Sequence, residues 1–566
     1  MAGPKSRYPA GVTEAHGTTP LRRHPRRLRV VVVVDGRTVP AAVARTIDRV
    51  AAVAVDLVGI RVEPPPRRRS LGLRLTALVD RVDRGCFRPG PDAFRPVDLG
   101  HLHSNLLVLG SQRASNPGIQ RLDMVLDLTS SGVAPTLDRT ARLGIWSLRY
   151  GMDSLPLGPA AFARDFMRGS EVSLTELVVH DDTPIRESTD TTRGTRVIYR
   201  SAGAMDRHSP ARTRNAAAWK AAEFPARVLS AVAAGRGPEP AEVTLPLSPR
   251  VGPPAARSIV GLVGQVVARG LREAIRRIVE RPGWFVAVRV GRPDHATNWP
   301  TDLRGFHPLV APPGRFYADP FIVRSPTGAH LFVEDAPIGG GPARIAVLEL
   351  DSTGRLQSAP CVALEARTHL SYPFVFQDGA DWYMLPETAG TQTVELFRAR
   401  RFPGDWEPFA VLLRDISASD PTLLHHDGLY WLFTTVAVSG ASPSDELCLY
   451  WSESLTGPWQ PHPRNPVVSD ARRARPAGRI LVNNGSLVRP AQDCTGGYGR
   501  RIVLNRIEVL SADEYRETPI GTIEPRWLAG VLRTHTYTVD DGMEALDGLR
   551  YERRLRFGRR AGPALR

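Results

Sequence analysis

Three polar residues open similar segments in the second half of the sequence. Asp319, Tyr372 and Asp420 each precede a proline and a short apolar run. A turn and a second apolar run follow in each segment, and the residues 15 positions after these markers are Glu334, Glu387 and Thr435. Polar groups repeated at one spacing indicate that the same structural unit presents a side chain at the same place each time.

Two weaker copies of the segment follow, at Asn484 and His535, so that the five markers lie 53, 48, 64 and 51 residues apart. Repeats of about 40 to 50 residues with several short strands are typical of propeller blades. We therefore expect a five-bladed all-β propeller over residues 284–560, closed by a strand from Trp284 to Val290. The longest interval contains an arginine-rich insertion, which we interpret as a surface loop: Arg472, Arg473, Arg475 and Arg479.

The first strand of every blade lines the central funnel of a propeller, so the markers should converge. We expect the following residues at one mouth of the funnel: Asp319, Tyr372, Asp420, Asn484 and His535, with Glu334 and Glu387 beside them. Such a set suits a hydroxyl-rich ligand, because carboxylates accept charge-assisted hydrogen bonds from sugar hydroxyls. A turn-capping role is the alternative for Asp319 and Asp420. A sugar-binding module that breaks no bond, and a scaffold without a ligand, are the alternatives to an enzyme.

Four motifs of this region carry a family resemblance: Phe316-Tyr317-Ala318-Asp319-Pro320-Phe321, His369-Leu370-Ser371-Tyr372-Pro373, Leu385-Pro386-Glu387-Thr388 and Arg489-Pro490-Ala491-Gln492-Asp493. Over about residues 285 to 555 the chain resembles the N-terminal propeller domain of plant glucosamine inositolphosphorylceramide transferases. The resemblance implies synthesis or modification of a glycan or glycolipid. Those transferases have a separate glycosyltransferase domain, so it also implies a separate glycosyltransferase as a partner.

The Asp-Pro blade starts also resemble the five-bladed glycoside hydrolases of families 43 and 32. This second resemblance implies that Asp319 is the general base or nucleophile and that Asp420 orients the substrate. Hydrolysis needs two carboxylates, one on each side of the scissile bond. The residue 15 positions after the third marker is Thr435, which cannot serve as the acid. Glu387 or Glu334 would therefore have to donate the proton.

The first half alternates apolar strands with helical periodicity, which predicts a Rossmann-type α/β domain over residues 28–235. Residues 123–128, 144–151 and 173–177 resemble the N-terminal domain of folate-dependent formyltransferases. Ser147-Leu148-Arg149 stands where that family has its Asn-x-His motif. We therefore expect no folate-dependent formyl transfer, and formyl or acyl transfer to an amino sugar is a further alternative. Arg149 would hold an anionic substrate or be an ordinary surface arginine.

The composition narrows the range of partners. The chain of 566 residues has a formal net charge of +16, but Lys5 and Lys220 are its only lysines and no nucleic-acid motif accompanies the charge. We expect no nucleic-acid partner. Four scattered cysteines, at Cys86, Cys361, Cys448 and Cys494, favour neither a disulfide framework nor a metal site. The sequence lacks a Gly-rich nucleotide motif, so no cofactor is expected.

No apolar window is long enough for a membrane span. The basic tail over residues 1–27 leads only into the short run Val30–Val34, which is shorter than a signal peptide requires. We expect a cytoplasmic protein, peripheral to a membrane at most. Residues 236–283 form a linker with a basic helix, which we interpret as an interdomain helix or, alternatively, as a helix on a membrane surface.

Overall fold

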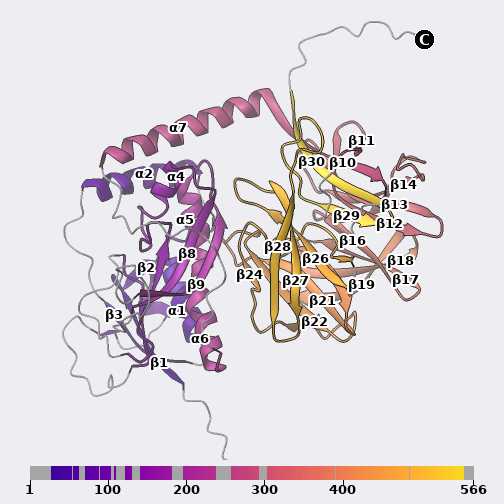
Figure 1. Ribbon diagram of the computed structural model, residues 1–566. Helices are drawn as coiled ribbons and strands as arrows, with labels where there is room; N and C mark the ends of the chain where they lie inside the picture. The colour runs from indigo at the N-terminus through magenta and orange to yellow at the C-terminus, as the bar shows by residue number, and fades with distance from the viewer. Residues whose placement is uncertain are drawn as a thin grey trace, which may run out of the picture.

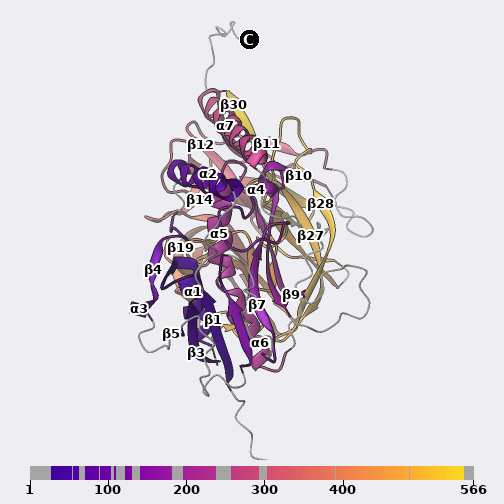
Figure 2. The same cartoon turned by 90° about the vertical axis from the view of Figure 1, so that its left-hand side faces the viewer.

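The computed structural model describes residues 27–53, 55–62, 71–87, 90–102, 108–109, 122–130, 141–180, 195–236, 256–291, 303–388, 390–483 and 485–553. An α/β domain lies beside a domain built from β-sheets, and the long helix α7 (Ala256–Val279) runs above the α/β domain to the edge of the sheets (Figure 1). Figure 2 shows the α/β domain in front of the sheets, with α7 at the upper end of the molecule. Among the helices within these ranges, none is long and apolar enough to cross a membrane.

A seven-stranded sheet in the order β5-β3-β1-β6-β7-β8-β9 forms the centre of the α/β domain. Its strands are β1 (Leu28–Val34), β3 (Val55–Val62), β5 (Val108–Leu109), β6 (Met124–Asp127), β7 (Ile145–Tyr150), β8 (Val172–His180) and β9 (Thr195–Ala204). The strands from β5 to β7 pair in parallel, and β8 and β9 are antiparallel. The valine-rich β1 is buried along nearly its whole length, as a central strand covered on both faces must be.

Six helices and a small strand pair accompany this sheet. They are α1 (Ala41–Ala51), α2 (Leu71–Phe87), α3 (Leu99–Leu102), α4 (Ala163–Met167), α5 (Pro210–Ala221), α6 (Phe224–Ala233), β2 (Thr38–Pro40) and β4 (Pro96–Asp98). Helix α1 buries Val43, Ile47 and Val50 against the sheet, because these residues recur at helical spacing. Helix α5 begins where Ser209 accepts a hydrogen bond from the Arg212 backbone N–H.

Five antiparallel sheets make up the second domain, which is therefore the predicted five-bladed propeller. The first three blades are β12 (Arg315–Ser325), β13 (Gly328–Pro337), β14 (Arg344–Leu350) and β15 (Cys361–Leu364); β16 (Ser371–Asp378), β17 (Asp381–Glu387), β18 (Thr393–Arg401) and β19 (Gly404–Arg414); and β20 (Ala418–His426), β21 (Leu429–Val436), β22 (Glu446–Ser452), β23 (Gln460–Pro461) and β24 (Val468–Ser469). The fourth is β25 (Leu481–Asn483), β26 (Ser486–Asp493), β27 (Arg501–Leu510) and β28 (Tyr515–Ile523).

The fifth blade joins the two ends of the propeller. It contains β29 (Tyr537–Asp540) and β30 (Met543–Arg553) together with β10 (Glu280–Val290) and β11 (His307–Leu309) from before the first blade. Strand β10 pairs with β30 from Glu280 to Val290. The predicted closing strand is confirmed, because its pairing with β30 joins the two ends of the propeller in one sheet.

The three strongest markers share one backbone geometry. Asp319, Tyr372 and Asp420 have φ values of 48°, 47° and 52°, in the left-handed region. In all three blades the register between the first two strands shifts at this point. Each marker therefore lies in a bulge within the first strand of its blade, and such a bulge re-aims the side chain that it carries.

Polar contacts join the α/β domain to the propeller. The buried Lys220 ammonium lies 2.7 Å from an Asp445 carboxylate oxygen, and the Arg227 guanidinium donates to both Glu446 oxygens at 2.6 and 2.7 Å. The Ser469 hydroxyl donates to the Ser201 hydroxyl at 2.8 Å. Because buried charges are paired across this junction, the two domains form one packed unit.

Candidate functional site

A histidine lies between two buried aspartates where the fifth blade meets the first. The His535 ring nitrogens lie 3.1 Å from Asp319 Oδ1 and 2.7 Å from Asp547 Oδ2. Burial lowers the pKa of His535, but the two carboxylates outweigh burial and raise it well above its ordinary value. Burial raises the pKa of Asp319, yet His535 and the Thr536 hydroxyl hold it below its ordinary value. Asp319 is therefore a buried carboxylate that stays ionised.

A second ion cluster lies between the second, third and fourth blades. Arg475 donates to Asp420 through Nε at 2.6 Å and through Nη2 at 3.1 Å, and Nη2 also reaches Glu387 at 3.3 Å. The Gln492 amide donates to Asp420 Oδ2 at 2.7 Å. Burial raises the pKa of Asp420, Arg475 opposes this effect, and the neighbouring Glu387 and Asp319 add to it. Two carboxylates thus share one guanidinium out of bulk water.

Carboxylates also bind the backbone of the marker bulges from one blade to the next. The Tyr372 N–H donates to Asp319 Oδ2 at 3.2 Å, and the Asp420 N–H donates to Glu387 Oε2 at 3.0 Å. The Asp319 N–H donates to Asp547 Oδ2 at 3.3 Å. These hydrogen bonds satisfy amides that the bulges remove from the strand ladders. Asp319 therefore caps the next blade's backbone as well as carrying charge at the centre.

The two glutamates of the site are slightly less buried than its two aspartates. Glu334 and Glu387 are 9% and 8% exposed, whereas Asp319 and Asp420 are 3% and 1% exposed. The half-exposed His369 places Nε2 3.2 Å from Glu334 Oε1. Burial and the nearby Asp319 raise the pKa of Glu334 despite this contact, and Glu334 in turn raises the pKa of His369. Glu334 is thus a buried carboxyl group that holds its proton more tightly than usual.

Aromatic rings complete the rim. The Trp284 ring of β10 lies 4.2 Å from the His535 ring, and the Tyr498 ring lies 5.2 Å from it. The Arg475 guanidinium lies 5.0 Å from the centre of the Tyr498 ring. Tyr498 is 41% exposed, so its outer part is open to a ligand. An aromatic ring can pack against the apolar face of a sugar ring, and the neighbouring polar groups can bind its hydroxyl groups.

Asp319, His535 and Asp547 also form a potential metal site within the described ranges, with ligand atoms within 4.8 Å of one another. The two ring nitrogens of His535 each face one of the carboxylates, so the three side chains are also paired with one another.

The structure brings most of the predicted site residues together. Asp319, Tyr372, Asp420 and His535 meet at the centre, and Glu334 and Glu387 lie beside them. The Tyr372 side chain is fully buried, and its hydroxyl contacts Thr422 and the Gly478 N–H. Asn484 falls outside the described residues, between β25 and β26. A substrate contact by any of these residues stays a prediction.

Three residues of the clusters were not anticipated: Arg475, Gln492 and Asp547. The prediction of a surface loop is wrong for Arg475, which is 7% exposed because two carboxylates draw its charge into the centre. Gln492 lies in a motif that carried the family resemblance, and that was its only signal. Asp547 follows its marker His535 by 12 residues instead of 15, so the spacing rule missed it.

Arg149 lies in the α/β domain, far along the chain from these clusters. It lies on β7, and its Nη2 lies 3.4 Å from His180 Nε2. His180 Nε2 also lies 2.8 Å from the Ser147 hydroxyl. Burial raises the pKa of Asp127, at the end of the adjacent β6, to about 6. Ser147 and Asp127 are paired in the sheet register, so both side chains belong to the same face. Binding of an anionic substrate by Arg149 stays a prediction.

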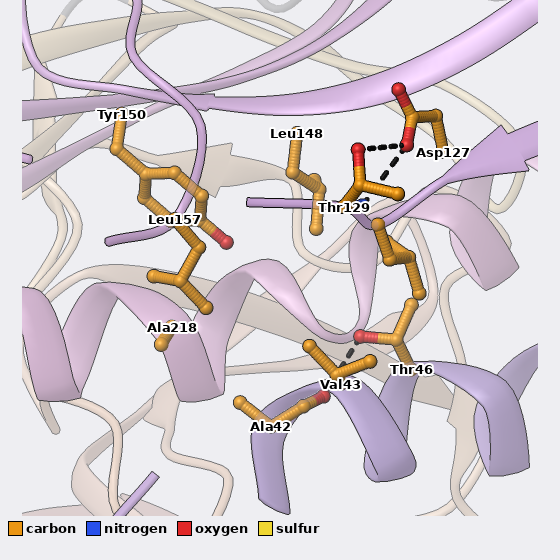
Figure 3. A pocket seen from close by; sticks show the side chains of 10 residues that line it. Ala42, Val43, Thr46, Asp127, Thr129, Leu148, Tyr150, Leu157 and Ala218 are labelled. Atoms are coloured by element: carbon orange, nitrogen blue, oxygen red, sulfur yellow. Dashed lines mark hydrogen bonds between the residues drawn. The ribbon is translucent and has the colours of Figure 1, made fainter. Parts of the chain in front are cut away.

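A small cavity lies between this sheet and helices α1 and α5 (Figure 3). Its lining includes Thr46, Leu148, Tyr150 and Ala218, and its volume is about 20 Å³. A cavity of that size holds about one water molecule. It is therefore too small for a substrate in this conformation.

The propeller is similar to one domain of a known protein family. Residues 308–526 match the family model of glucosamine inositolphosphorylceramide transferase 1, N-terminal. The curated relatives named glucosamine inositolphosphorylceramide transferase 1 include one from Oryza sativa subsp. japonica, 37% identical over 212 residues, and one from Arabidopsis thaliana, 36% identical over 211 residues. Each alignment covers 37% of this chain and 28% of the relative. The predicted resemblance to this propeller domain is thus confirmed, and the chain spans little more than a quarter of these relatives.

Solved structures with some likeness are glycoside hydrolases. An exo-β-1,3-galactanase from Clostridium thermocellum is 14% identical, with a TM-score of 0.33 and coverage of 45% of this chain and 63% of that one. A family 117 glycoside hydrolase from Zobellia galactanivorans is 11% identical, with a TM-score of 0.32 and coverage of 48% and 91%. The resemblance of residues 28–235 to formyltransferases is shown by none of these matches and stays a prediction.

Proposed function

We propose that this protein acts in the synthesis or modification of a glycan or glycolipid and binds a sugar at the mouth of the propeller. The observation that carries the proposal is the pair of neighbouring buried ion clusters, with Glu334 and the exposed Tyr498 beside them. The match to the transferase propeller domain supports the glycolipid class. A separate glycosyltransferase would supply the transfer step.

The clusters suit a polyol because they fix charges before the ligand arrives. Asp319 and Asp420 have their oxygens occupied by protein donors, so they set the charge of the site from beneath. Glu334 and Glu387 retain some exposure and can accept hydrogen bonds from hydroxyl groups. Preorganised groups of this kind lose little entropy when the ligand binds.

Hydrolysis by the same site is the second candidate function. Its support is Glu334, a carboxyl group with a raised pKa beside the ionised Asp319. Two carboxyl groups with separated pKa values are what an acid and a base or nucleophile require. In this mechanism Glu334 donates the proton to the leaving oxygen. Asp319 acts as base or nucleophile only if its contacts with Thr536 and His535 open towards the substrate. Glu387, held by Arg475, would orient the substrate.

A glycan array followed by incubation of the bound glycans with the protein tests the proposal. Binding with a change in glycan mass supports an enzyme, and binding without one supports a sugar-binding module. Asp319→Asn and Asp420→Asn should each weaken binding at least about tenfold, which corresponds to about 1.4 kcal/mol. Asp427→Asn is the matched control, because Asp427 lies in an exposed turn with 85% of its side chain exposed. Absence of any glycan binding by the folded wild-type protein would overturn the proposal.

For the α/β domain we propose a role without folate-dependent formyl transfer. Ser147 and Arg149 occupy the positions where the formyltransferase resemblance requires Asn and His. Arg149 could instead hold an anionic group of the glycoconjugate, or of an amino sugar that accepts an acyl group. Formyl transfer from a folate donor by the native chain, measured directly, would contradict this reading.

A further inference from the structure

Helix α7 carries an apolar stripe that faces away from the protein. Its members are Val260, Val263, Val267, Leu271, Ile275 and Ile278, which are between 42% and 75% exposed. At 100° per residue they fall within an arc of about 120°. The opposite side of the helix holds it in place, because Ile259 and Leu262 are buried and Leu262 packs against Phe166. The stripe is thus a fixed outer surface of the described chain.

Basic residues lie on both flanks of the stripe. Arg272 and Arg277 are exposed on either side of it. Arg277 pairs with Glu273 of the same helix at 3.0 Å, and 76% of its side chain is still accessible. Arg269 and Arg276 lie further round, against Phe166 and Tyr551. The neighbouring helix α2, whose Val79 packs in the same cluster as Leu262, adds exposed Leu71, Leu78 and Val82. The full sequence carries a formal net charge of +16.

We propose that α7 binds the surface of an anionic lipid membrane, with its apolar stripe in the headgroup boundary and its arginines on lipid phosphates. An amphipathic helix with arginines beside an apolar face lies in the plane of such an interface, and its affinity grows with buried apolar area and anionic charge. Charge complementarity selects a lipid surface over a second copy of this basic chain, which would repel it. The exposed apolar residues of α2 lie beside those of α7, and neighbouring exposed apolar residues of this kind mark interaction surfaces.

The location of the helix connects this surface to the propeller site. Helix α7 continues directly into β10, and Trp284 of β10 contacts the His535 ring. Arg276 lies 4.7 Å from the Tyr551 ring of β30, in the same blade. A membrane held by α7 would therefore lie close to the blade that carries part of the site. Binding of α7 to lipid does not depend on turnover. Only the choice of a glycolipid in that membrane as the substrate rests on the proposed function.

Vesicle co-sedimentation of the full chain tests the proposal. The protein should bind phosphatidylcholine vesicles that contain phosphatidylglycerol, and should bind pure phosphatidylcholine vesicles at least tenfold more weakly. Leu271→Glu should weaken binding at least tenfold, and Arg272→Glu with Arg277→Glu should remove most of the salt dependence. Val310→Glu is the control, because Val310 is 83% exposed elsewhere. Thermal unfolding shows that each variant is folded.

Three results would overturn the proposal. The first is no binding of the folded wild-type protein to the anionic vesicles. The second is equal binding by Leu271→Glu and Val310→Glu. The third is a dimer in light scattering that Leu271→Glu abolishes, which would make the stripe an interface between copies. Loss of vesicle binding with intact glycan binding contradicts the membrane surface alone, and the reverse result contradicts the sugar site alone.

Discussion

Replacement of Arg475 by methionine should destabilise the propeller strongly. Methionine keeps the length and the apolar stem of the side chain but removes the guanidinium that Asp420 and Glu387 share. Arg475 is 7% exposed and Asp420 is 1% exposed, so little water can replace the lost charge. Removal of one partner from a buried ion pair costs about 3 to 5 kcal/mol, because the other charge is left uncompensated.

The same variant should show a coupled and pH-dependent defect. Without Arg475 the pKa of Asp420, already raised by burial, rises further. A raised carboxyl pKa contributes stability that is present at low pH and is lost as pH rises, so the deficit should be larger at pH 8 than at pH 5. Asp420→Asn combined with Arg475→Met should cost less than the sum of the single changes, by at least about 1 kcal/mol.

Urea unfolding followed by tryptophan fluorescence measures these free energies. The control is Arg506→Met, because Arg506 is an exposed arginine of β27 and its loss should change stability by less than about 0.5 kcal/mol. A cost of less than about 1 kcal/mol for Arg475→Met, or a deficit that does not depend on pH, would show that Arg475 does not compensate the two buried carboxylates.

Three further predictions concern other groups. His535→Gln should lower the free energy of unfolding most below about pH 6.5, the ordinary pKa of histidine. The deficit should shrink as pH rises towards the raised pKa of His535. Urea unfolding at several pH values measures the deficit, and a deficit that grows with pH contradicts the prediction. If the site hydrolyses a glycoside, Glu334→Gln should lower turnover at least about a hundredfold with little change in binding, whereas Glu365→Gln, with 64% of its side chain exposed, should change neither; equal turnover by the two variants removes Glu334 as the acid. A folate donor incubated with the native chain should yield no formylated amino sugar in a mass-spectrometric assay, and a formylated product would show that Ser147 and Arg149 do not prevent the reaction.

Much of the propeller could be predicted from local sequence. The marker spacing of Asp319, Tyr372 and Asp420 follows from one hairpin geometry, and the structure shows the same left-handed bulge at all three. Such a bulge and its turn are properties of a short stretch of chain, so they leave a periodic signal. The closing strand β10 could be predicted as well, because an open ring would expose an unpaired edge.

The fourth and fifth blades departed from the pattern. The spacing rule placed a marker at Asn484, but β25 ends at Asn483 and the group that reaches Asp420 comes from Arg475, before that strand. Asp547 likewise breaks the 15-residue offset. An arginine cluster in a long insertion is ordinarily solvated, and its sequence gives no sign of which member will meet a carboxylate from another blade.

The sequence by itself determined which short segments become strands and where polar side chains would gather. Only the tertiary structure decided the partners and the charge states, because both depend on burial and on groups far apart in the chain. His535 and Asp319 lie 216 residues apart, yet their contact reverses the effect of burial on both pKa values. A periodic pattern records the direction of a side chain, whereas its electrostatics follow from which distant groups the folded ring brings within a few ångströms.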